Sequence, residues 1–256
     1  MSEFKNAKVI AIVNHKGGCG KTTTTVNLAA EFARQGNRVL VVDLDPQANA
    51  TLHIGKVHPS NVEVSAADLL TGDHSLLAPS VQDDTTIDGV CLISGSLALG
   101  KAEDELKDLS PRPNEELRSK LLPADSVFDV ILIDCPPSLG IMTINAFVAA
   151  DEVLIPMQAE YYALEGLALL TRSIDRIARI HNPGLGVSMI VLTMFDGRTT
   201  LAREVESEVR SYFPDATLDT KVPRSIRVAE APSFGAPVVF WDPRSTGAIA
   251  YKKMAR

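Results

Sequence analysis

Long apolar runs are absent from this chain of 256 residues. No run approaches the roughly 18 consecutive apolar residues that a membrane-spanning helix requires. The first eight residues, MSEFKNAK, also lack the apolar core of a secretory signal peptide. These two absences predict a chain without a membrane-spanning helix that stays in the cytoplasm.

Cysteine is scarce as well. The three cysteines, Cys19, Cys91 and Cys135, are an odd number and lack the C-x-x-C spacing of metal and redox motifs. Disulfide bonds are rare in the cytosol. We therefore expect three reduced, partly buried thiols rather than a disulfide framework.

Positive charge is not in excess over the whole chain. The formal net charge of −7 argues weakly against nucleic-acid binding. The charge is unevenly distributed, because residues 1–171 carry 12 Lys/Arg and 23 Asp/Glu, whereas residues 172–256 carry 13 and 9. A solvated surface without function would look the same, so the relatively basic C-terminal third leaves the question open.

Short β-branched runs alternate with longer helical patterns such as residues 22–36 and 160–181. Most of the runs are continuously apolar, as expected for strands that are buried on both faces. They cover residues 8–14, 38–44, 90–94, 129–134, 153–157, 187–193 and 237–240. The alternation predicts an α/β fold, a mostly parallel twisted sheet with helices on both faces.

We expect residues 1–256 to form a single domain, because the length fits one large core and no linker or repeat interrupts the pattern. Residues 101–122 are dense in charge and contain a proline break. We interpret them as two exposed helices joined by a loop, a solvated face rather than a site.

The segment HKGGCGKT, residues 15–22, follows a predicted strand and opens a predicted helix. It departs from the strict G-x-x-x-x-G-K-[ST] pattern, because His15 stands where the first glycine belongs. Glycines let backbone N–H groups face phosphate oxygens, and the start of the helix adds its positive end. Lys21 is expected to reach the β- and γ-phosphates, Thr22 to bind Mg²⁺ and Thr23 to contact a phosphate. The loop predicts a P-loop NTPase-like fold that uses ATP and Mg²⁺.

The run KGGCGKTTT resembles the deviant Walker A box of the ParA/MinD group of ATPases. The resemblance implies that Lys16 is the signature lysine, which reaches the phosphates of the partner's ATP in a nucleotide-sandwich dimer. A cation supplied in this way neutralises charge that develops on the transferred phosphoryl group. Without the resemblance, a solvated loop lysine is an equally good interpretation of Lys16.

Aspartates follow two predicted strands, where side chains border the ligand crevice of a parallel sheet. Asp43 and Asp45 lie in VVDLDPQANAT, and Asp134 lies in FDVILIDCPPSLG. A strand-end turn begun by Asp-Pro is the alternative interpretation of the first segment. Both segments resemble motifs of the same family. The resemblance implies that Asp45 positions or polarises the attacking water, that Asp43 supports the metal and the switch region, and that Asp134 holds Mg²⁺ through a water molecule.

The C-terminal segment from residue 221 matches P-R-x-x-R-x-x-E-A-P-S-x-G and resembles chromosomal ParA (Soj) proteins. This resemblance implies that Pro223 and Arg224 line the adenine pocket. It also implies that Arg198 and Arg227 bind DNA phosphates once the ATP dimer forms. Arginines directed at the backbone give affinity without sequence readout. An ordinary surface arginine is the alternative at both positions.

The resemblance as a whole implies an ATP hydrolase that segregates DNA. A MgATP-driven homodimer would bind DNA non-specifically on the nucleoid. It would be released when a ParB-like protein stimulates hydrolysis, so that a chromosome or plasmid is partitioned. One alternative is a ParA-like ATPase that positions a protein cargo, such as a carboxysome or a chemoreceptor cluster. Another is a metabolic P-loop enzyme of the dethiobiotin-synthetase kind. A membrane partner is not expected, because the chain shows no basic amphipathic helix of the MinD type at its end.

The candidate residues fall into four groups: catalytic (Lys16, Lys21, Asp45), nucleotide-binding (Gly17, Gly18, Cys19, Gly20, Lys21, Thr22, Thr23, Pro223, Arg224), metal-binding (Thr22, Asp43, Asp134) and DNA-binding (Arg198, Arg227).

Overall fold

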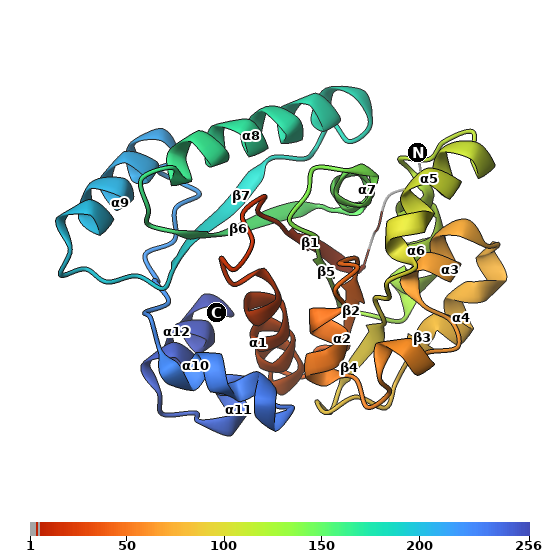
Figure 1. Ribbon diagram of the computed structural model, residues 1–256, viewed down its shortest axis with the longest axis horizontal. Coiled ribbons are helices and arrows are strands. Elements are labelled where there is room, and N and C mark those ends of the chain that lie inside the picture. Colours follow the sequence, from red (N-terminus) through yellow and green to blue (C-terminus); the bar gives the residue numbers. More distant parts are fainter. Residues whose placement is uncertain (1–3, 5) are drawn as a thin grey trace.

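The computed structural model describes residue 4 and residues 6–256. A seven-stranded sheet in the order β3-β4-β2-β5-β1-β6-β7 forms the centre of the described chain (Figure 1). The strands are β1 (Lys8–Ile12), β2 (Val39–Asp43), β3 (Val81–Gln82), β4 (Val90–Ile93), β5 (Val130–Asp134), β6 (Glu152–Gln158) and β7 (Val187–Thr193). All neighbours pair in parallel except β3, which is antiparallel to β4.

The helices cover both faces of this sheet. They are α1 (Lys21–Arg34), α2 (Asn49–Ile54), α3 (Ala66–Thr71), α4 (Leu77–Ser80), α5 (Leu99–Leu109), α6 (Glu116–Leu121), α7 (Ile141–Ala149), α8 (Ala163–Ile180), α9 (Thr200–Tyr212), α10 (Ile226–Glu230), α11 (Val238–Trp241) and α12 (Thr246–Met254). Short 3₁₀ turns lie at Pro59–Asn61, His74–Leu76, Leu122–Ser126 and Ala231–Phe234.

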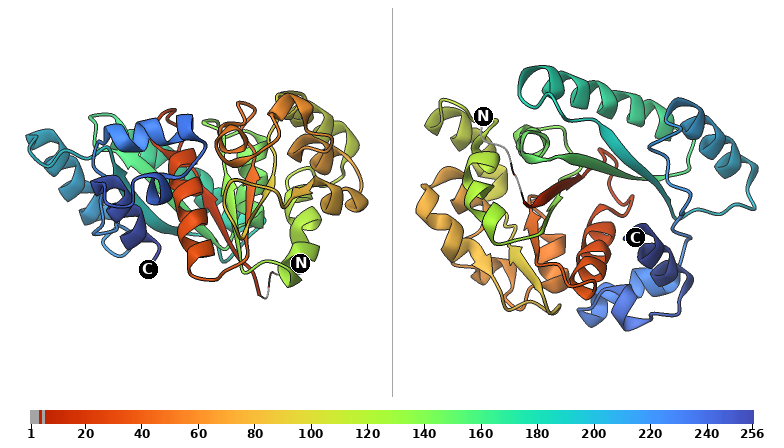
Figure 2. Two further views of the ribbon diagram at one scale, coloured as in Figure 1. Left: turned by 90° about the horizontal axis from the view of Figure 1, so that it is seen from below. Right: turned by 180° about the vertical axis from the view of Figure 1, so that it is seen from behind.

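Two apolar clusters divide the core. One joins a sheet face to α3 and α5–α9, and the other joins the opposite face to α1, α2, α11 and α12. Successive residues of a strand alternate between them, as Val9 and Ile10 do in β1. Burial on both faces explains why the strand segments are continuously apolar. Figure 2 shows α1 and α12 side by side on one of these faces.

The predicted α/β architecture is confirmed, with six of the seven predicted strands in place. The prediction of a strand at residues 237–240 was wrong, because Val238–Trp241 is the helical turn α11. Val238 and Val239 are buried against α1 and α12, so the apolar character of the run serves a helical contact rather than a sheet. Strand β3 was missed because it is only two residues long, which is too short to show the alternation of apolar and polar residues that marks a strand.

The interpretation of residues 101–122 was only partly right. Two helices, α5 and α6, are joined by a loop as predicted. They are not simply exposed, because Leu106 and Leu117 are buried in the core. Lys120 is 4% exposed, and its ammonium donates a hydrogen bond to the carbonyl of Gly72 at the end of α3. The many charged residues of this segment masked the apolar positions that pack into the core.

Candidate nucleotide site at the carboxyl edge of the sheet

The loop between β1 and α1 is built on two glycines with left-handed backbone. Gly18 has φ +72° and Gly20 has φ +92°, which L side chains rarely adopt. Gly20 is the N-cap of α1 and has no side chain to satisfy the first N–H groups of the helix. Those donors, together with the positive end of α1, favour the binding of an anion such as phosphate. The predicted phosphate loop is therefore present as a backbone cradle.

The first turn of α1 connects this cradle to the end of β5. The Thr22 hydroxyl donates a hydrogen bond to Asp134 Oδ2 at 2.7 Å, and the Thr25 hydroxyl lies 3.3 Å from Asp134 Oδ1. Lys21 is 7% exposed, and its ammonium donates to the carbonyl of Lys16 at 3.4 Å. The Lys21 ammonium and the Thr22 hydroxyl therefore lie at the same edge of the sheet as the Asp134 carboxyl group.

Asp43 and Asp134 are direct neighbours in the pairing of β2 with β5. Both side chains are completely buried. Burial, together with the negative charge of Asp43, raises the pKa of Asp134 to about 8. Burial also raises the pKa of Asp43 to about 6, although hydrogen bonds from Thr51 and Asp45 oppose the shift. Two buried carboxylates at this spacing leave negative charge that a cation would neutralise.

The hydrogen bonds of Asp43 hold the segment that follows β2. Its Oδ2 accepts from the backbone N–H and the hydroxyl of Thr51, at 2.9 and 2.8 Å, and its Oδ1 accepts from the Asp45 N–H at 3.2 Å. The N–H of Gly95 in turn donates to the Thr51 hydroxyl at 2.8 Å. A Cβ at Gly95 would lie 2.9 Å from Asp43 Cγ, so only glycine fits there. These contacts make Asp43 a support for the α2 segment, and its role toward the metal stays a prediction.

Asp45 lies beyond the end of β2 rather than on the strand, so it does not share a strand face with Asp43. It is 7% exposed, and its Oδ1 accepts a hydrogen bond from the Gln47 N–H at 2.9 Å. The residue after this turn, Ala48, has φ +51° and begins α2. A non-glycine residue in this conformation is uncommon and occurs where the surrounding structure imposes it.

A cavity of about 490 Å³ connects the loop, the start of α1 and α2, within the usual range for small-molecule sites. It brings together most of the predicted nucleotide residues with several that sequence reasoning missed. The lining consists of Gly17, Gly18, Gly20, Lys21, Thr22, Thr23, Asp45, Gln47, Asn49, Leu52, His53, Pro137, Met194 and Pro232. The additional residues come from four separate segments. Gln47, Asn49, Pro137 and Pro232 lie within the motifs that carry the family resemblance, whereas no local motif marks Leu52, His53 and Met194.

Pro223 and Arg224 do not line this cavity. Pro223 lines a separate hollow with Phe195 and Lys221, and Arg224 is exposed. The backbone of Phe195 pairs with that of Pro223, and Met194, the residue before Phe195, lines the cavity. Their assignment to the adenine pocket stays a prediction.

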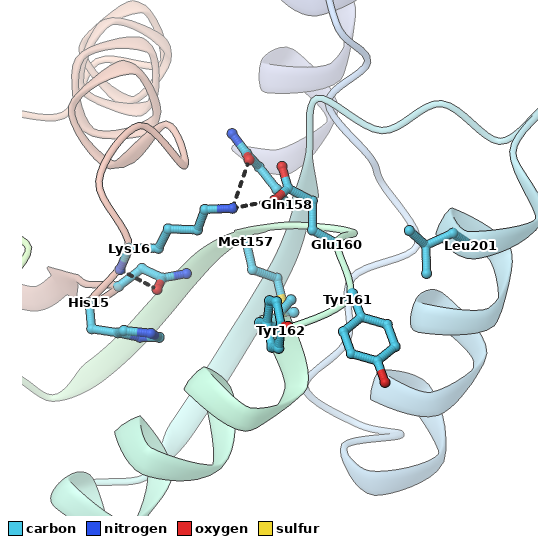
Figure 3. Close-up of a pocket in the computed structure, with 10 residues that line it drawn as sticks. His15, Lys16, Met157, Gln158, Glu160, Tyr161, Tyr162 and Leu201 are labelled. Atoms are coloured by element: carbon cyan, nitrogen blue, oxygen red, sulfur yellow. Dashed lines mark hydrogen bonds and ion pairs between the residues drawn. The ribbon is translucent and has the colours of Figure 1, made fainter.

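Lys16 lies on the other side of the loop. It lines a second hollow of about 480 Å³ with residues of the β6–α8 connection (Figure 3). Its ammonium forms an ion pair with Glu160 and donates to Gln158 Oε1 at 3.3 Å. The adjacent aromatic rings of Tyr161 and Tyr162 are exposed by 75% and 74%. The two lysines of the loop therefore serve opposite sides of it.

Side chains from β6 and β7 fix the loop from outside. Gln158 Nε2 donates to the carbonyl of Gly18 at 2.9 Å, and the Thr193 hydroxyl donates to the carbonyl of Cys19 at 2.7 Å. The Cys19 thiol is buried, and burial raises its pKa, so any nucleotide contact at Cys19 comes from its backbone. Cys19, Cys91 and Cys135 are all free thiols, as predicted.

The two predicted DNA-binding arginines lie on separate segments. Arg198 is in the loop before α9, where it forms a two-bond ion pair with Asp196 at 2.8 and 2.6 Å. Arg227 is in α10, on the side of the molecule where α11 and α12 lie (Figure 1). Both arginines are exposed, so either can bind an external phosphate.

The residues at this edge fit ATP with Mg²⁺. No group of three or more His, Cys, Asp or Glu side chains within residue 4 and residues 6–256 is arranged to hold a metal by itself. Mg²⁺ does not need one, because it keeps several waters and takes phosphate oxygens as ligands. The Thr22 hydroxyl would hold the ion directly and Asp134 would hold it through water, while Lys21 would pair with the phosphates. The metal, when bound, would neutralise charge on the phosphoryl oxygens.

Comparisons with known proteins agree with this geometry. A family model described as an AAA domain matches residues 7–187. The chain is 44% identical to the sporulation initiation inhibitor protein Soj of Bacillus subtilis, over 97% of each chain. It is 41% identical to the chromosome partitioning protein ParA of Caulobacter vibrioides, over 97% of this chain and 92% of that one.

The chain belongs to the Soj/ParA family of chromosome-partitioning ATPases. It is a DNA-segregation ATPase that hydrolyses ATP and uses Mg²⁺, and the family implies self-association and partition partners in general terms. The fold is also similar to a solved structure described as cobyrinic acid a,c-diamide synthase from Mycobacterium smegmatis with bound ADP and magnesium. The TM-score is 0.84 and the sequence identity 34%, over 97% of this chain and 92% of that one. The higher identity to Soj and ParA favours partitioning over a metabolic enzyme.

No helix among the described residues is both long and apolar enough to cross a membrane.

Asp134 generates a prediction about pH. Without metal, the native state holds the Asp134 proton up to a pH of about 8, whereas the unfolded chain releases it near its ordinary value of about 4. The free energy of unfolding should therefore fall as pH rises from about 4 through about 8. Asp134→Asn removes this penalty. At pH 8.5 in EDTA, the variant should unfold at least about 2 °C above the wild type, and the gap should close near pH 5.

Thermal unfolding scans across this pH range measure the effect. Addition of MgATP should then stabilise the wild type far more than Asp134→Asn. Asp104→Asn is the matched control, because its carboxylate is exposed and the change in net charge is the same. Identical pH profiles for the wild type and Asp134→Asn would contradict the assigned cause.

Proposed function

We propose that this chain forms an ATP-dependent sandwich dimer that binds DNA without sequence preference. Hydrolysis, stimulated by a ParB-like protein, releases the dimer from the nucleoid and so moves a chromosome or plasmid. In this proposal the whole chain acts as one ATPase domain. Lys16, Lys21 and Asp45 are its catalytic residues, and Arg198 and Arg227 are its DNA contacts.

The position of Lys16 is the observation that carries the dimer. Lys16 lines a different hollow from the nucleotide cavity, and its ammonium is occupied by Glu160 and Gln158 rather than directed at its own phosphate loop. The exposed rings of Tyr161 and Tyr162 beside it supply apolar surface that a second copy would bury. A cation offered outward, next to such surface, suits action on a partner's phosphates.

The DNA part of the proposal rests on charge. The chain as a whole is acidic, so one copy has little general attraction for a polyanion. A dimer presents Arg198 and Arg227 twice on one assembly and doubles the number of phosphates that they neutralise. Binding should therefore depend on ATP and weaken steeply with salt.

Lys16→Ala tests the dimer. The variant should bind ATP as a monomer, because Lys16 does not line the nucleotide cavity. It should fail to dimerise, and stimulated turnover should fall by about 10³-fold, the low end of what a cation supplied in trans contributes. Light scattering with ATP and a phosphate-release assay measure both effects. Lys56→Ala, which removes another ion-paired surface lysine, is the control. Normal dimerisation and turnover of Lys16→Ala would make Lys16 a bystander.

Asp45→Ala tests the chemical step. The carboxylate borders the cavity, and its removal should slow hydrolysis by at least ~100-fold, as for other acid–base or positioning groups. ATP binding should persist, so the variant should accumulate as an ATP-bound dimer in size-exclusion chromatography. Stimulated hydrolysis within a few-fold of wild type would rule out this role.

Arg198→Ala and Arg227→Ala test the DNA contacts. Each variant should weaken binding on two unrelated duplexes equally and leave ATP-driven dimerisation intact. A dimer that loses two phosphate contacts should lower the slope of log affinity against log salt by up to about 1.8. Arg38→Ala, an exposed arginine paired with Asp129 before β2, is the control. Equal affinity with ADP and ATP would remove the nucleotide switch, and preference for one duplex would indicate a site-specific repressor.

A further inference from the structure

Arg227 is surrounded by an aromatic cluster that the phosphate-binding hypothesis does not explain. Its guanidinium carbon lies 5.6 Å from the centre of the Trp241 ring, within cation–π range. The Trp241 ring is itself stacked on Phe234, with centroids 4.5 Å apart and an angle of 20° between the planes. Phe234 is 61% exposed. A stacked aromatic pair at the surface thus forms a platform under one arginine.

Two carboxylates approach the same guanidinium. Arg227 Nη1 lies 3.3 Å from Glu230, and Nε lies 3.5 Å from Asp242. Both N···O distances are longer than those of the ion pair between Arg198 and Asp196. The Arg227 side chain remains 58% exposed. Exposed ion pairs of this kind hold a side chain weakly. The contact with Trp241 is of similar strength to either ion pair, so the ring is one of three groups that restrain Arg227.

The two kinds of contact have opposite consequences for an incoming phosphate. A carboxylate uses the N–H donors of the guanidinium and competes with phosphate for them. An aromatic face attracts the cation through its quadrupole and leaves those donors free. The ring can thus hold Arg227 in place while the donors bind DNA.

The cluster is also connected to the nucleotide cavity. Pro232 lines the cavity, and Phe234 of the same 3₁₀ turn carries the stack. Two residues later, the carbonyl of Ala236 lies 3.1 Å from Nε2 of His53, a cavity residue on α2. One short segment therefore contacts the nucleotide cavity on one side and supports the arginine on the other.

We propose that Trp241, supported by Phe234, is a positioning residue that holds Arg227 ready for DNA phosphate, and that Asp242 competes with the phosphate. This inference rests on the proposed DNA-binding function. It adds a residue that no sequence motif marks and a carboxylate whose removal should strengthen binding. The Pro232–Ala236 segment links this cluster to the nucleotide site.

The test is DNA affinity in the presence of ATP for the intact protein and its variants. Trp241→Ala should weaken binding by about 2- to 5-fold, the effect of one cation–π contact at an exposed site. Trp241→Phe keeps an aromatic face and should recover most of the loss. Asp242→Asn should tighten binding by up to about 5-fold, as expected for removal of an exposed ion pair, and a folding defect cannot mimic this gain.

The double variant Trp241→Ala/Arg227→Ala decides whether the ring acts through the arginine. It should bind DNA no more weakly than Arg227→Ala alone, because the coupling energy between contacting residues disappears with either partner. An equal loss from Trp241→Ala with and without Arg227 would overturn the proposal, as would looser binding by Asp242→Asn. Phe240→Ala, an exposed neighbour in α11, is the control, and both its DNA affinity and its ATP turnover should match those of the wild type.

Fluorescence separates this inference from the proposed function. Trp241 is the only tryptophan of the chain, so its emission reports on this cluster alone. Arg227→Ala should shift that emission in the absence of DNA, and unchanged emission would show that the contact does not exist in solution. If Arg227→Ala shifts the emission but leaves DNA affinity unaltered, the cluster exists, the DNA contact at Arg227 is wrong, and the positioning role falls with it.

Discussion

Two carboxyl groups buried side by side in the sheet govern the arrangement of this site. Asp43 and Asp134 are paired across β2 and β5 and have no exposure to solvent, so burial disfavours the ionised form of each and raises the pKa of each. Hydroxyl groups from α1 donate hydrogen bonds to Asp134, and the hydroxyl of Thr51 donates one to Asp43. A cation bound beside this pair would further favour the ionised form of both carboxyl groups. The hydrogen bonds of Asp43 also hold the segment that leads into α2.

The phosphate loop lies between two hollows, and its fixed position separates the duties of its two lysines. Gln158 and Thr193 hold the carbonyls of Gly18 and Cys19 from the β6 and β7 side, which leaves the backbone N–H groups to face the cavity. Lys21 begins α1 and lines the nucleotide cavity, where it would pair with phosphates. Lys16 comes before the glycines and is directed outward to Glu160. Two lysines five positions apart therefore lie toward two different hollows.

The C-terminal segment closes the nucleotide site and also carries surface charge. It packs against α1 through α11 and α12, and the N–H of Val239 donates to the Asn27 side chain at 3.2 Å. This contact places Pro232 at the cavity and leaves Arg227 exposed on the neighbouring turn. The nucleotide cavity and the arginine that we propose to bind DNA are thus joined by a few residues of one segment, which offers direct contacts for coupling between them.

Sequence by itself determined the elements whose chemistry is local. The six parallel strands follow from continuous apolar runs, and the phosphate loop follows from glycines between a strand and a helix. Asp43, Asp45 and Asp134 were found because strand ends of a parallel sheet meet at one edge. Tertiary structure alone decided the rest. Val238–Trp241 became a helix because its apolar side chains had α1 and α12 to pack against, which a local pattern cannot reveal. Gln158, Thr193, His53 and Pro232 reach the site from distant segments, and only the folded chain brings them within hydrogen-bonding or contact distance.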